Sequence, residues 1–222
     1  MNELTHEELV RLAHQFYPRG FPPEEDDPSE SPPAHQRTPE HQRFMAAWDR
    51  ALHWEAWGTF MEQLRATFPG YSIGGGTQPF VSACLRCQLY KVAAQPDGDQ
   101  LVTRMAAAVS VLAPLYVVYV TTQRWDPPRG PEAASTPTDP GAFRLRRASR
   151  PQLTFEPPSD LKPDADALGG LVERILRCRP FPLKLASLPV TGLRIGQLNW
   201  LSSDPPPTLL DVFFSDDLAN LP

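Results

Sequence analysis

The segment 101–120 constrains the fold more than any other part of this chain. It reads LVTRMAAAVSVLAPLYVVYV, and no charged residue interrupts the sixteen residues from Met105 onward. A membrane-spanning helix needs roughly 20 apolar residues, whereas this segment carries a central Pro114 and a cluster of β-branched residues. It therefore predicts two buried strands, 101–112 and 115–124, that reverse at the proline and pair as antiparallel neighbours.

Two further strands are expected upstream of this pair. Residues 71–73 begin one strand, and the three glycines at 74–76 are expected to end it. Residues 80–92 predict the next strand, and the Pro-Asp-Gly sequence at 96–98 is typical of a turn between strands. Together with the pair above, these segments predict an antiparallel β-meander.

Helices are predicted at the N-terminal end of the chain. Thr5 and Glu8 have the spacing of a capping box, and the apolar residues that follow recur at helical intervals. Thr38 as N-cap and a proline at the first helical position open a second helix. Its pattern continues over residues 39–68, and Gly58 is the only position that favours a bend. Its apolar surface is broader than packing on one sheet face requires.

The second half of the chain predicts one more helix and several short strands. Residues 164–178 place apolar side chains on one helical face. Residues 143–155 predict a shorter polar strand, and 193–201 and 208–214 predict two late strands that dock on the meander. The expected fold class is α+β, with an antiparallel β-meander packed against N-terminal helices and one later helix. We expect residues 1–222 to form a single domain.

Proline and cysteine content indicates long loops and a reducing compartment. The 27 prolines are about twice the usual share. Their clusters predict surface loops at about 18–38, 126–142 and 203–207. Three cysteines do not form a disulfide framework, and the first residues lack a basic and then apolar signal sequence. We therefore expect a cytoplasmic protein.

The net charge of −5 is unevenly distributed along the chain. Residues 1–40 hold 3 basic and 9 acidic side chains, residues 201–222 hold 4 acidic and no basic ones, and residues 143–200 hold 10 basic and 5 acidic ones. Acidic ends argue against nucleic acid as the main partner, because phosphate binding depends on clustered Lys and Arg. The basic patch at 144–150 is better explained as a solvated strand edge. A basic protein partner fits this charge distribution better than a nucleic acid or a membrane.

The cysteines offer one possible route to enzyme chemistry. Cys84 and Cys87 have the spacing of half a zinc site, but a closed tetrahedral site needs two further ligands and no second pair exists. Cys178 lies between two arginines, which would favour the reactive thiolate. Packing of buried cysteines, and cations at a helix C-terminus, are the simpler explanations. A zinc- or thiol-dependent enzyme using Cys84/Cys87 or Cys178 is retained as an alternative.

No catalytic motif occurs elsewhere in the sequence. There is no GxSxG, no phosphate-binding loop with its GK pair and no HExxH. Adjacent aspartates such as Asp216 and Asp217 would diverge in a strand, and Asp97 and Asp99 flank a turn glycine. We therefore predict no catalytic residue, no metal and no cofactor, and expect a non-enzymatic protein-binding module.

The chain resembles bacterial immunity proteins of polymorphic toxin systems. The resemblance rests on CLRCQLY at 84–90, VLAPLYVVYVTTQR at 111–124 and DVFFSDDLANLP at 211–222, which follow an N-terminal helical region. Members of this class are small cytosolic α+β proteins, often acidic, that block a cognate toxin domain such as a nuclease. The resemblance implies an inhibitor and transfers no catalytic residue.

A toxin-binding surface would combine acidic side chains with aromatic anchors. A second alternative is a structural or regulatory subunit that dimerises through the exposed part of the tryptophan-rich helix. The candidate partner-binding residues are Glu24, Glu25, Asp26, Asp27, Trp54, Trp57, Asp216 and Asp217.

Overall fold

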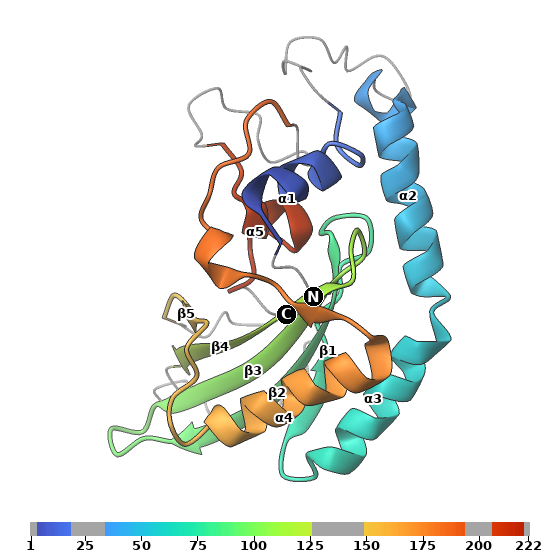
Figure 1. Cartoon of the computed structure of the whole chain (residues 1–222). Helices are drawn as coiled ribbons and strands as arrows, with labels where there is room; N and C mark the ends of the chain where they lie inside the picture. The colour runs from blue at the N-terminus through green and yellow to red at the C-terminus, as the bar shows by residue number, and fades with distance from the viewer. Residues whose placement is uncertain (1–3, 19–33, 126–148, 194–205, 220–222) are drawn as a thin grey trace, which may run out of the picture.

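A sheet lies at the centre of the protein (Figure 1). The computed structural model describes residues 4–18, 34–125, 149–193 and 206–219. Five strands follow one another in chain order and pair antiparallel, and a sixth short strand pairs parallel with β4. The predicted α+β fold with an antiparallel β-meander is confirmed. The strands are β1 Ser72–Gly75, β2 Cys84–Ala94, β3 Gln100–Ser110, β4 Leu115–Trp125, β5 Gln152–Thr154 and β6 Arg179–Pro180.

The central strands form as expected, and the strands before them differ in their bounds. β3 and β4 pair in register from Gln100↔Trp125 to Val109↔Tyr116. The prediction that glycines end the first strand is wrong, because two of them lie within β1. There Gly74 pairs with Gln88, and a Cβ at that glycine would lie 3.3 Å from the glutamine side chain. The absence of a side chain at Gly74 thus leaves room for the side chain of Gln88 on the neighbouring strand.

Helices flank the sheet on both sides. The predicted capping box at the first helix is confirmed: the Thr5 hydroxyl accepts from the Glu8 N–H, and the Glu8 carboxylate accepts from the Thr5 N–H. The α-helices are α1 His6–Ala13, α2 Pro39–Leu52, α3 Glu55–Thr67, α4 Lys162–Leu171 and α5 Leu209–Phe213; the short turns of other types are η2 Ala34–Arg37, η4 Val172–Leu176 and η5 Leu183–Leu185.

The long helix predicted over 39–68 is two helices. The break lies at His53 and Trp54, not at Gly58, because Trp54 has an extended backbone with ψ 99°. Trp48 on α2 belongs to one core cluster, and Phe60 on α3 belongs to the other. The broad apolar surface seen in the sequence is therefore two stripes that serve two faces of the sheet.

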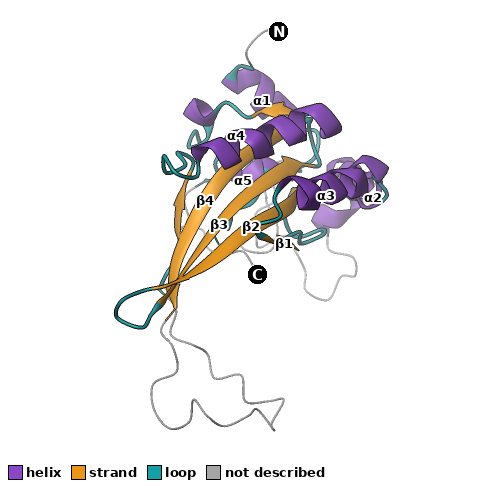
Figure 2. Ribbon diagram, turned by 90° about the horizontal axis from the view of Figure 1, so that it is seen from below, coloured by secondary structure: helices purple, strands orange, loops and turns teal. Residues whose placement is uncertain are grey.

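The sheet has a hydrophobic core on each face. Residues of α1, α2 and α5 pack on one face, which we call the first face. Residues of α3, α4 and η4 pack on the other, the second face, and Figure 2 shows α3 and α4 side by side against the sheet. Successive residues of β4, such as Tyr119 and Val120, point to opposite cores. The central strands are apolar on both sides because both sides are covered.

The late strand predicted over 208–214 is wrong, because this segment forms α5. The Thr208 hydroxyl accepts from the Asp211 N–H, and the Asp211 carboxylate accepts from the Thr208 N–H at 2.7 Å. This capping box starts a short helix whose Val212 and Phe213 are fully buried. The shorter strand predicted over 143–155 forms as β5 in its described part, Gln152–Thr154, whereas residues 143–148 lie outside the described residues. The strand predicted over 193–201 lies outside the described residues except for residue 193.

None of the helices described in this structure is both long and apolar enough to cross a membrane.

Candidate functional site

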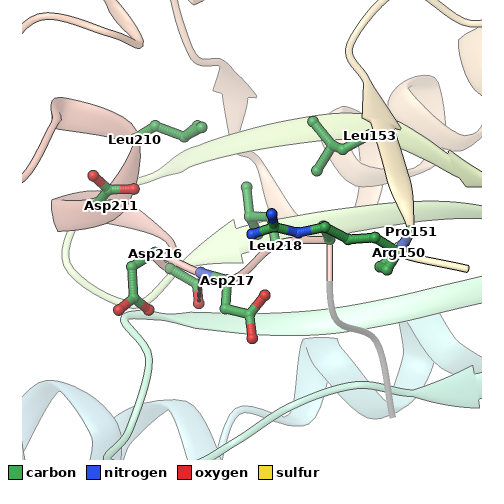
Figure 3. A pocket seen from close by; sticks show the side chains of 10 residues that line it. Arg150, Pro151, Leu153, Leu210, Asp211, Asp216, Asp217 and Leu218 are labelled. Carbon is green, nitrogen blue, oxygen red and sulfur yellow. Dashed lines mark hydrogen bonds between the residues drawn. The ribbon is translucent and has the colours of Figure 1, made fainter. Parts of the chain in front are cut away.

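A pocket of about 320 Å³ opens between β5 and the segment that follows α5. Figure 3 shows aspartates along one side and Arg150 reaching in from the opposite side. The floor and walls also contain apolar side chains such as Leu153 and Leu218. The lining residues are Arg150, Pro151, Leu153, Leu210, Asp211, Ser215, Asp216, Asp217, Leu218 and Ala219.

Backbone contacts fix the acidic side of this pocket. The carbonyl of Phe214 accepts from the Ala83 N–H at 2.8 Å, which joins the segment to the residues before β2. The Ser215 hydroxyl accepts from the Asp217 N–H at 3.1 Å, and Leu218 is buried. With its apolar neighbours turned inward, this segment leaves Asp216 and Asp217 exposed.

The charged groups that line the pocket are three carboxylates on one side and the guanidinium of Arg150 on the other (Figure 3). Partial burial raises the pKa of Asp216, and the nearby carboxylates of Asp211 and Asp217 raise it further. Asp211 also caps α5, so its position is fixed by the helix. A cationic group entering here would relieve the repulsion between these carboxylates. Among the described residues, no group of three or more His, Cys, Asp or Glu side chains is arranged to hold a metal ion.

Arg86 lies beneath this segment, on the first face of the sheet, and is fully buried. Its Nη1 donates to the carbonyl of Asp217 at 3.3 Å, and its Nη2 donates to Oε1 of Gln78 at 2.9 Å. Within the described residues, no carboxylate forms an ion pair with it, and its Nε has no hydrogen-bond partner. One buried guanidinium thus connects the β1–β2 loop to residues 215–218 after α5, which we call the acidic segment.

The predicted acidic residues Asp216 and Asp217 lie together at this pocket. Trp54 and Trp57 are partly buried and pack against both core clusters, so much of their surface contributes to packing. Their role in partner binding stays a prediction. The acidic residues at 24–27 lie outside the described residues.

The three thiols do not form a common site. Cys84 packs in the core of the first face and Cys87 in the core of the second, since residues three apart in a strand point to opposite sides. The two cannot bind one metal ion in this fold. Burial raises the pKa of both thiols to about 12, and burial raises that of Cys178 to about 11. Burial therefore works against the thiolate that the cysteine alternative requires.

Two features of this region were missed in the sequence. Arg86 lies in the buried first half of β2, and its lone charge within CLRCQLY was the available signal. The prediction that the strand over 80–92 begins at Phe80 is wrong, because β2 begins at Cys84 and Phe80 lies in the preceding turn with a positive φ of 65°. Its preceding proline, in the sequence TQPF, was the signal for a turn.

Comparisons with protein-family models, with curated proteins and with solved structures find no match to this chain.

Proposed function

We propose that this protein is a non-enzymatic binding module that neutralises a basic protein partner, as a bacterial immunity protein neutralises its cognate toxin. The observation that carries the proposal is the gathering of Asp211, Asp216 and Asp217 on one side of the pocket. A toxin with a basic cleft, such as a nuclease domain, has the complementary charge. The inhibitor would act in the cytoplasm, where its three free cysteines stay reduced.

The charge arrangement supports rapid and selective association. Exposed carboxylates of one sign attract a basic partner over a Debye length and raise the association rate. Partial burial, and then the neighbouring carboxylates of Asp211 and Asp217, raise the pKa of Asp216. A Lys or Arg from the partner would offset the repulsion among these carboxylates, whereas a nucleic acid would increase it.

The zinc- or thiol-dependent alternative has less support. It would need Cys84 and Cys87 on one side of a strand, or a cysteine with a lowered thiol pKa. The two thiols point to opposite cores, and burial raises the thiol pKa of all three cysteines. No observation on the described residues favours the subunit alternative, which light scattering across protein concentrations would test.

A selection for rescued toxicity tests the proposal. Genomic fragments from the source organism are expressed in a bacterial host with and without this chain. We expect at least one fragment to kill the host alone and to be tolerated when the chain is present. If no lethal fragment is rescued, the proposed function is wrong.

Variants in the same selection connect the rescue to the pocket. Asp216→Lys combined with Asp217→Lys is expected to reduce rescue strongly, because it reverses the charge that faces the partner. Glu62→Lys combined with Asp160→Lys is the control, since it makes the same charge change at exposed positions away from the pocket. Equal loss of rescue in both variants would show that only net charge matters.

The acidic residues at 24–27 are also expected to contact the basic partner. Lysine at all four positions is expected to slow association with the rescued toxin and to leave stability unchanged, because the sequence predicts a solvated loop there and solvated charges contribute little to stability. Stopped-flow measurement of the association rate checks this. An unchanged rate would exclude these residues as part of the contact.

A further inference from the structure

The turn before β2 exposes two large apolar side chains. Phe80 is 46 % exposed and Val81 is 69 % exposed, whereas most large apolar residues of the described chain are buried. Contiguous exposed apolar side chains, unlike single scattered ones, are a feature of contact surfaces. We call these two residues the apolar tip.

The apolar tip is held outward by a constrained backbone. Phe80 has φ 65°, a left-handed conformation that is unfavourable for a bulky residue and persists only where its surroundings impose it. The N–H groups of Val81 and Ser82 both donate to the carbonyl of Gln78, at 3.3 and 3.2 Å. The indole Nε1 of Trp48 donates to the carbonyl of Ser82 at 2.9 Å. The turn is therefore fixed before any partner arrives.

The Trp48 ring also supports one side of the Phe80 ring. The two ring centroids lie 5.8 Å apart with an interplanar angle of 49°, and Trp48 itself is fully buried. One side of the Phe80 ring is thus packed and the rest faces solvent. An aromatic side chain held in this way loses little further conformational entropy on binding.

Arg86 joins the apolar tip to the acidic segment. Its guanidinium donates to Gln78, two residues before Phe80, and to the carbonyl of Asp217. The hydrogen bond from the Ala83 N–H to the Phe214 carbonyl joins the same two segments. These hydrogen bonds therefore join the loop that carries the apolar tip to the segment that carries Asp216 and Asp217.

We infer that the apolar tip and the carboxylates of Asp216 and Asp217 form one docking surface for a protein that presents an apolar recess bordered by Lys or Arg. The inference rests on the proposed function and names its surface. The apolar tip would enter the recess as the central anchor, and the carboxylates would meet the basic border. The carboxylates argue against a nucleic acid or an anionic membrane as the occupant, because both would be repelled.

Peptide selection tests this surface directly. A phage-displayed library of random cyclic peptides is panned against the whole immobilised protein, and enriched peptides are synthesised and titrated by calorimetry. We expect enriched sequences to combine Lys or Arg with aliphatic or aromatic residues. We expect Phe80→Asn and Val81→Asn each to weaken their binding at least tenfold, and Asp216→Asn combined with Asp217→Asn to weaken it severalfold.

The variants are chosen to keep the fold. Asparagine tolerates a positive φ better than most residues, so Phe80→Asn removes the ring without opposing the turn. Val81 is largely exposed, so its replacement keeps the inference testable if Phe80→Asn lowers stability. Leu183→Asn is the matched control, because Leu183 is an exposed apolar residue on η5. We expect this substitution to leave peptide binding unchanged.

Three results would overturn the inference. Enriched peptides that bind both tip variants as tightly as the wild type would place the binding surface elsewhere, while rescue of a toxin would still support the proposed function. Enriched peptides that lack basic residues would exclude the basic border. No enrichment over the empty matrix would exclude a preformed docking surface, and the rescue selection would then decide the proposed function independently.

Discussion

Arg86 is a fully buried guanidinium whose two hydrogen-bond acceptors are both uncharged. Moving a charged group from water into the protein interior costs several kcal/mol unless an opposite charge compensates it. The acceptors, the Gln78 amide and the Asp217 carbonyl, belong to exposed residues that water could satisfy instead. The arginine therefore contributes more to holding two segments together than to stability.

We predict that Arg86→Met raises the free energy of unfolding by about 1 kcal/mol, because it removes a desolvated charge and keeps most of the side-chain volume. Urea denaturation followed by tryptophan fluorescence measures the change. Arg65→Met on α3 is the control, since that side chain is exposed and its loss should change stability by less than about 0.5 kcal/mol. A loss of more than about 2 kcal/mol in Arg86→Met would mean that the charge is compensated.

Local signals in the sequence predicted where several helices begin. They did not predict where the long helix divides or that residues 209–213 form a helix. The capping box of Thr5 and the N-cap of Thr38 work through hydrogen bonds within three residues, so sequence alone locates them. The break at Trp54 depends on two sheet faces that need covering, which no local pattern contains. In α5, the spacing of Thr208 and Asp211 was a helix signal that the apolar run LLDVFF obscured.

Two adjacent glycines of α4 offer a matched test of how the helix packs. Gly170 is exposed, and a Cβ there would meet nothing within 4 Å, whereas a Cβ at Gly169 would lie 3.0 Å from the hydroxyl of Tyr116. That hydroxyl donates to a carboxylate oxygen of Glu173 at 2.8 Å. The contact leaves room for a glycine and little more.

We predict that Gly170→Ala raises the free energy of unfolding by about 0.5–1 kcal/mol, because alanine favours the helix and restricts the unfolded chain. Gly169→Ala gains the same preference but displaces the Tyr116 hydroxyl, and we expect a net loss of about 1 kcal/mol. Thermal unfolding of both variants checks the difference. Equal stabilisation by both would show that α4 can shift away from β4 at no cost.

At the scale of the whole molecule, both hydrophobic cores contain buried cysteines whose thiol pKa values reflect the exclusion of water. Cys84 lies in one core, and Cys87 and Cys178 lie in the other. Burial raises the pKa of all three thiols above the ordinary value of 9.0, so the folded protein holds these protons more tightly than the unfolded chain does. Their contribution to stability is fully present below about pH 9 and is lost as pH rises through the folded pKa values.

We predict that the free energy of unfolding falls steadily between pH 9 and about 12, the pKa of Cys84 and Cys87 in the fold. Urea denaturation at a series of pH values measures the slope. Replacing all three cysteines with alanine should make the slope shallower, whatever it does to stability at neutral pH. Identical slopes would mean that other groups, such as the buried tyrosines, account for the alkaline loss.

The sequence by itself determined the β-meander, because long apolar strands with a proline at their reversal have few other ways to bury their surface. It also determined the caps of α1 and α2, which depend on neighbouring residues alone. Only the tertiary structure decided that the Cys84 and Cys87 thiols face different cores and that the predicted helix divides at Trp54. It alone linked Gln78, two residues before the exposed pair at 80–81, to the backbone of Asp217, because the fold brings both within hydrogen-bond reach of Arg86.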